Sequence, residues 1–138
     1  SYVTADTALS FYGLIPERVY ATISATTRLS AQYQTEAGLF VYKHVPVPYY
    51  AFGITSHALT GTQHALIASP QKAVLDKIVC TPGMIVRSRK QAYELLFDNL
   101  RLDEEDLKQL RWDEARTWLE DAPKAGSLHY IVDTIQAL

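Results

Sequence analysis

The amino-acid sequence predicts an α+β fold. A mainly antiparallel sheet at residues of about 19–68 is expected between an N-terminal helix and a C-terminal helical segment. Alternation of apolar and polar residues dominates the first half of the chain, whereas helical periodicity dominates the second half. The predicted strands also follow one another too closely for helical crossovers, which disfavours a parallel α/β fold. We therefore interpret residues 1–138 as a single α+β domain.

A short helix is predicted close to the first residue. Thr4 is a suitable N-cap, Asp6 suits the positive end of the helix dipole, and Gly13 is a suitable stop. The apolar residues between them recur at helical spacing. A helix of this length is not stable alone in water, so we expect it to pack against the rest of the domain.

Strand patterns follow this helix. Gly38 supplies the positive φ that a tight hairpin turn needs, and Pro46 and Pro48 end the strand that leaves this turn. A loop is expected around Gly61. The predicted strands, chosen by alternation and by their content of β-branched and aromatic residues, are 19–27, 31–35, 39–45, 50–54 and 63–68.

The second half of the chain predicts helices. Ser69 followed by Pro70 combines an N-cap with proline at the first helical position, and Pro82–Gly83 breaks the helix that begins there. Lys72 and Asp76 stand four residues apart and are expected to pair on the surface of this helix. The predicted helices span 70–79, 88–100, a segment starting at the acidic residues 103–106, 112–119 and 127–138.

Composition excludes several classes of protein. The 138 residues contain no apolar stretch approaching the 20 or so residues that a membrane span requires. The single cysteine, Cys80, excludes an internal disulfide and a multi-cysteine zinc site, and a cytoplasmic location is the default. His57 and His64 can approach each other across the turn, but two histidines are too few for a metal site. No nucleotide-binding glycine motif is present, so we expect neither a cofactor nor a metal.

Catalytic patterns are also missing. Cys80 directly follows the helix predicted at 70–79, and at this C-terminal end the helix dipole raises the pKa of a thiol. Lys43 ends a strand as in metal-dependent nucleases, but the carboxylate expected two residues before it is absent. We therefore expect a protein without enzymatic activity. The alternative is a degenerate nuclease-like enzyme with carboxylates from distant positions such as Glu36, Asp76 and Glu94.

Charge is unevenly distributed along the chain. Residues 1–93 carry eight basic and four acidic side chains, whereas residues 94–138 carry five and eleven. Arg87, Arg89 and Lys90 lie where a helix begins, and cations are unfavourable there. This placement indicates an anionic partner, either nucleic acid or an acidic protein surface. The alternative is an intramolecular match to the acidic helices.

Four blocks of sequence, in order over residues 2–76, resemble the C-terminal domain of AbiEi-type antitoxins. They read YVTADTALSFYGLIPE from residue 2, VYATISATT from residue 19, VYKHV from residue 41 and IASPQKAVLD from residue 67. The acidic helical segment that follows resembles the family only in general character.

The resemblance implies an antitoxin of a bacterial type IV toxin–antitoxin system, which serves abortive infection and phage defence. In such proteins a winged helix-turn-helix binds promoter DNA, and the C-terminal domain counteracts a nucleotidyltransferase-type toxin. The winged helix is expected upstream of Ser1 and is absent from this chain. A further alternative is an oligomerisation module of a transcription factor. Contact of this domain with nucleic acid or a partner is expected to involve its basic side chains: Arg18, Arg28, Lys43, Arg87, Arg89 and Lys90.

Overall fold

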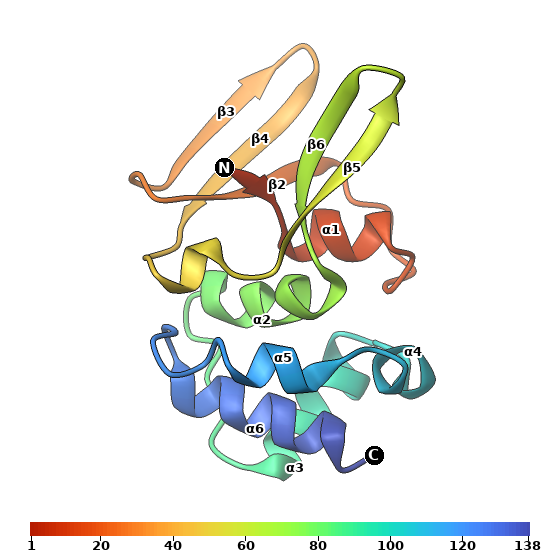
Figure 1. The fold of residues 1–138 in the computed structure, drawn as a ribbon, viewed down its shortest axis with the longest axis vertical. Coiled ribbons are helices and arrows are strands. Elements are labelled where there is room, and N and C mark those ends of the chain that lie inside the picture. The colour runs from red at the N-terminus through yellow and green to blue at the C-terminus, as the bar shows by residue number, and fades with distance from the viewer.

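A computed structural model describes residues 1–138 and places them in three layers (Figure 1). The β-sheet forms one end of the molecule, two helices cross the middle, and the remaining helices form the other end. This arrangement confirms the α+β class. The helices are α1 (Ala5–Phe11), α2 (Pro70–Cys80), α3 (Arg89–Tyr93), α4 (Glu104–Lys108), α5 (Trp112–Arg116) and α6 (Ala125–Gln136), with a 3₁₀ turn η1 (Tyr49–Ala51) and a π-helix η2 (Glu94–Asn99).

The sheet has six strands in the order β3-β4-β2-β1-β6-β5. Three neighbouring pairs are antiparallel, as predicted, but β2 with β4 and β1 with β6 are parallel, so the sheet is mixed. Strands close in sequence become parallel here because β3 reverses the chain between β2 and β4, using Gly38 at φ 125° in the second turn. The strands are β1 (Tyr2–Val3), β2 (Ala21–Thr26), β3 (Ala31–Thr35), β4 (Gly38–His44), β5 (Ile54–Thr60) and β6 (Gln63–Ala68).

Two details of the predicted sheet are wrong. Strand β1 was not predicted, because two residues are too few to show alternation. The strand predicted at 50–54 is instead the turn η1, and the next strand begins only at Ile54. Carbonyl groups of η1 and its neighbour Phe52 point at a lysine side chain rather than at an adjacent strand. The expected loop around Gly61 is correspondingly reduced to a tight turn between β5 and β6.

The helix signals are mostly confirmed. Gly13 ends the first helical segment at φ 71°. Ser69 caps α2 by accepting a hydrogen bond from the main-chain N–H of Lys72 at 3.2 Å, and Pro70 is its first residue. Ser88 and Asp103 cap α3 and α4 in the same way. The predicted helix at 88–100 continues through the π-helix η2, an irregularity that apolar periodicity does not reveal.

Helix α2 lies at the centre of the core. It contacts α1 and β6 on one side and α5 and α6 on the other, and Figure 1 shows it between the sheet and the C-terminal helices. Lys72 and Asp76 are therefore fully buried, and the prediction that they pair on a helix surface is wrong. A continuous core of 26 buried hydrophobic residues extends from Tyr2 to Ile135 around this helix. None of the helices combines the length and the apolar composition needed to cross a bilayer.

Candidate functional site

The most concentrated polar chemistry in the chain is a buried network around the carboxylate of Asp76. Its Oδ2 accepts hydrogen bonds from the hydroxyls of Tyr2 at 2.7 Å and Thr4 at 2.8 Å. Its Oδ1 accepts one from the hydroxyl of Tyr49 at 2.7 Å. Thr4 does occupy the N-cap position of α1, but its side chain bonds to Asp76 and makes no cap hydrogen bond. The carboxylate thus joins β1, the start of α1 and η1 to α2.

The ammonium group of Lys72 completes this network. Its Nζ donates to the main-chain carbonyls of Tyr49 at 2.7 Å, Tyr50 at 3.3 Å and Phe52 at 2.5 Å. An ammonium group has three N–H donors, so all of them are used. Nζ also lies 4.1 Å from the centroid of the Tyr49 ring, a favourable cation–π contact. Burial lowers the pKa of Lys72 to about 8, against the opposing effect of the Asp76 charge.

The network is closed to solvent. Tyr2, Thr4, Tyr49, Lys72 and Asp76 are each at most 1% exposed, and no buried polar side-chain atom lacks a hydrogen-bond partner. Burial raises the pKa of Asp76, while the Lys72 charge and the three donated hydroxyls oppose the rise. A carboxylate that receives three hydrogen bonds matches its ionised form. The network therefore connects secondary-structure elements in the core, and none of its five side chains is accessible to a substrate.

This network unites two of the sequence blocks that carry the family resemblance. Tyr2 and Thr4 belong to the first block, and Lys72 and Asp76 belong to the fourth. Sequence reasoning missed the connection because it placed the last two residues on a helix surface. One signal was available in the sequence: Lys72 and Asp76 directly flank the apolar run 73–75. If that run is buried, the two charged side chains beside it are buried too and need hydrogen-bond partners inside the protein.

The two buried tyrosines predict an unusual alkaline titration. Burial, followed by the nearby Asp76 charge, raises the pKa of Tyr2 and Tyr49 far above the ordinary value of about 10. Their contribution to stability is therefore present below pH of about 10 and is lost as the pH rises further. We expect phenolate absorbance to report these two tyrosines only as the protein unfolds. Tyr49→Phe should reduce this late phase by one tyrosine. Ionisation of all nine tyrosines before any loss of circular dichroism would contradict the network.

The carboxylates of the nuclease alternative do not come together. Glu36 lies in the β3–β4 turn, Asp76 is buried, and Glu94 is exposed on η2, among the C-terminal helices. No group of three His, Cys, Asp or Glu side chains is close enough to hold a metal ion. His57 and His64 do not come together either. His64 lies opposite Ala58, the neighbour of His57 in β5. Because adjacent residues of a strand point to opposite faces of the sheet, the two histidines are on opposite faces.

The six predicted binding residues fall into separate places. The Arg18 guanidinium lies 5.4 Å from the centroid of the exposed Tyr20 ring in the loop before β2. Arg28, in the β2–β3 loop, lines a shallow pocket with Tyr42. Lys43 lines a different pocket with Cys80, so it faces α2 and does not share a surface with Arg28. The remaining three, Arg87, Arg89 and Lys90, are exposed together at the start of α3, at the opposite end of the molecule from the β-hairpins.

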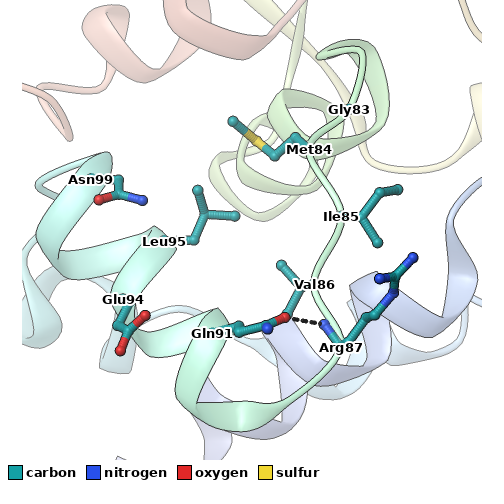
Figure 2. A pocket seen from close by; sticks show the side chains of 9 residues that line it. All are labelled: Gly83, Met84, Ile85, Val86, Arg87, Gln91, Glu94, Leu95 and Asn99. Carbon is teal, nitrogen blue, oxygen red and sulfur yellow. Dashed lines mark hydrogen bonds between the residues drawn. The ribbon is translucent and has the colours of Figure 1, made fainter.

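The three cations at the start of α3 are here called the α3 basic cluster (Arg87, Arg89 and Lys90). Arg87 lines a groove, and Arg89 and Lys90 follow it in the chain as the first residues of α3. The groove has a volume of about 530 Å³. It lies between the segment 83–87 and residues 91–99 of α3 and η2, as Figure 2 shows. None of the three side chains forms a salt bridge, although the acidic helices lie in the same half of the molecule. The intramolecular charge match is thus not formed at this cluster. Glu94 is the one carboxylate that lines the groove.

The positions of two of these cations predict a gain in stability on charge reversal. Arg89 and Lys90 are the first two residues of α3, where the helix dipole favours acidic side chains. We expect Arg89→Glu/Lys90→Glu to raise the free energy of unfolding by about 0.3–1 kcal/mol. Thermal melting followed by circular dichroism measures this change. A clear loss of stability would mean that these cations have favourable contacts within the domain.

Comparison of this chain with protein-family models, curated proteins and solved structures yields no match.

Proposed function

We propose that this chain is a non-enzymatic effector domain of a type IV antitoxin, which counteracts a nucleotidyltransferase-type toxin through the α3 basic cluster. The observation that carries the proposal is the cluster itself. The three side chains are exposed and form no salt bridge. Arg87 lines the groove, and Arg89 and Lys90 are the first residues of α3, where the helix dipole disfavours cations. A placement that costs stability without an internal partner is expected where a surface serves an external, anionic one.

The buried network supports the family part of the proposal. Side chains from the first and fourth resemblance blocks meet at Asp76, although they are more than sixty residues apart in the chain. Two blocks that share one hydrogen-bonded network constrain each other, which supports reading them as one motif. In this proposal promoter binding belongs to a winged helix outside the chain, and the system operates in the bacterial cytoplasm in phage defence.

Growth rescue tests this proposal. Cells that express the cognate nucleotidyltransferase toxin receive either residues 1–138 alone or the same residues joined to the winged helix. We expect the chain alone to restore growth, which assigns the antitoxin activity to these residues. Rescue only by the longer protein would show that the winged helix is also required. Failure of both proteins, while each is folded and present in the cell, would overturn the antitoxin assignment.

The exposed sheet edge favours a second candidate function, that of an oligomerisation module. Strand β3 is an edge strand with the sequence AQYQT, which has no charge and no proline to prevent pairing with another strand. Tyr33 in its centre is 57% exposed. Light scattering of the purified chain distinguishes the candidates, because a strictly monomeric protein at high concentration excludes oligomerisation through this edge.

A further inference from the structure

The segment 84–87 lies outside the helices and strands, but its side chains alternate as in an extended chain, and one of its two edges is already hydrogen-bonded. Figure 2 shows its side chains alternating, with Met84 and Val86 on one side and Ile85 and Arg87 on the other. The N–H of Val86 donates to Ser127 Oγ at 3.0 Å, and this hydroxyl donates back to the Val86 carbonyl at 3.1 Å. The Met84 carbonyl accepts from Lys124 Nζ at 3.2 Å. This edge is therefore fixed to the start of α6.

The other edge of the same segment is open. Residues two apart in a strand direct their main-chain groups to the same side, so Ile85 and Arg87 share this edge. The N–H and carbonyl of Ile85 and the carbonyl of Arg87 form no hydrogen bond. The N–H of Arg87 donates to the side-chain Oε1 of Gln91 at 2.8 Å, across the groove in Figure 2. A side-chain amide thus occupies the position that the carbonyl of a neighbouring strand would take.

We propose that this groove binds an acidic peptide segment in extended conformation, which adds to the open edge as a strand. The peptide would use the N–H and carbonyl of Ile85, replace Gln91 at the N–H of Arg87, and place carboxylates near the α3 basic cluster. The proposal rests on the proposed function only in taking this surface as the working surface of the domain.

The observations favour a peptide over a nucleic acid. An open strand edge offers alternating donors and acceptors, and a peptide main chain supplies the complementary set. The phosphates of a nucleic acid supply acceptors but no donors, so a row of phosphates does not complement an edge on which N–H and carbonyl groups alternate. The charged side chains at the groove determine which peptide sequences are preferred. Arg87 lines the groove, the unpaired Arg89 and Lys90 follow within three residues of it, and Glu94 is the only carboxylate of the lining, so acidic residues are favoured, except beside Glu94.

A titration monitored by amide NMR tests the proposal with a capped octapeptide in which threonine and glutamate alternate. We expect the Ile85 and Arg87 amide signals to shift most and their hydrogen exchange to slow. Replacing glutamate with lysine in the peptide should abolish binding. Methylating alternate peptide nitrogens on the paired edge should weaken it by about tenfold, because one to two hydrogen bonds are lost.

Ile85→Pro supplies the matching change in the protein. It removes an N–H that has no partner in the free domain, so stability should change little while peptide affinity falls by about tenfold. If this variant does not fold, the methylated peptide still decides the question. Equal binding of the methylated peptide, shifts confined to another surface, or binding of a single-stranded oligonucleotide without the peptide would overturn the proposal. Growth rescue is measured separately, so loss of peptide binding and loss of antitoxin activity are distinguishable.

Discussion

Asp76→Ala is expected to lower the free energy of unfolding by about 3–5 kcal/mol, as removal of one partner from a buried charged network does. The substitution leaves the hydroxyls of Tyr2, Thr4 and Tyr49 without their shared acceptor in the core. It also leaves the buried ammonium of Lys72 without the nearest opposite charge. Because small domains are stable by only about 5–15 kcal/mol, much of this margin would be lost. Equilibrium urea unfolding measures the change.

Asp6→Ala is the matched control for this prediction. Asp6 also forms a contact with a lysine, to Lys77 Nζ at 3.0 Å, but both side chains are partly exposed, at 33% and 21%. Ion pairs of this kind contribute about 0–1 kcal/mol. Asp76→Asn should give an intermediate loss because its amide oxygen still accepts from one of the hydroxyls. Equal losses for Asp76→Ala and Asp6→Ala would show that the buried network does not hold the domain together.

Gly53→Ala is expected to be comparably disruptive. Gly53 has φ 67°, and a Cβ built there would lie 2.7 Å from Cη2 of Trp118 and 2.9 Å from Cβ of Lys72. The left-handed conformation costs an alanine about 1–2 kcal/mol, and overlap with a packed core adds about 1–3 kcal/mol. We expect a loss of about 2–5 kcal/mol in the free energy of unfolding, together with a change in Trp118 fluorescence.

Gly13→Ala separates the cost of the left-handed backbone conformation from the cost of the steric overlap. Gly13 has nearly the same backbone conformation, φ 71°, but a Cβ added there meets nothing within 4 Å. Only the conformational cost of about 1–2 kcal/mol is therefore expected. The difference between the two variants measures the close approach of the 52–54 turn to the C-terminal helices. A difference near zero would contradict that packing.

Local signals in the sequence were sufficient for most elements of the fold. The Ser69–Pro70 start, the Gly38 hairpin and the helix starts at residue 88 and at the acidic residues 103–106 each depend on residues close in the chain, and the structure confirms them. The parallel pairing of β2 with β4 could not be predicted in this way. It depends on β4 lying between β3 and β2, a choice between strands that alternation does not encode.

The buried network escaped prediction for a related reason. Spacing of four residues correctly places Lys72 and Asp76 on neighbouring turns of one helix, but it does not say what lies opposite that face. Their partners come from β1, the start of α1 and η1, all remote in sequence. The α3 basic cluster was found from sequence because its signal, cations at a helix start, is local. The groove beside it was not, because it forms between segments that become neighbours only on folding.

A charge-reversal comparison in the growth-rescue assay tests the central claim most directly. Arg89→Glu/Lys90→Glu reverses two exposed cations of the α3 basic cluster, and Lys108→Glu/Arg111→Glu reverses two exposed cations elsewhere, with the same change in net charge. We predict that residues 1–138 with the first change melt no lower than the unchanged chain yet fail to restore growth. The second variant should restore growth fully. Equal rescue by both variants would contradict an antitoxin role for the α3 basic cluster.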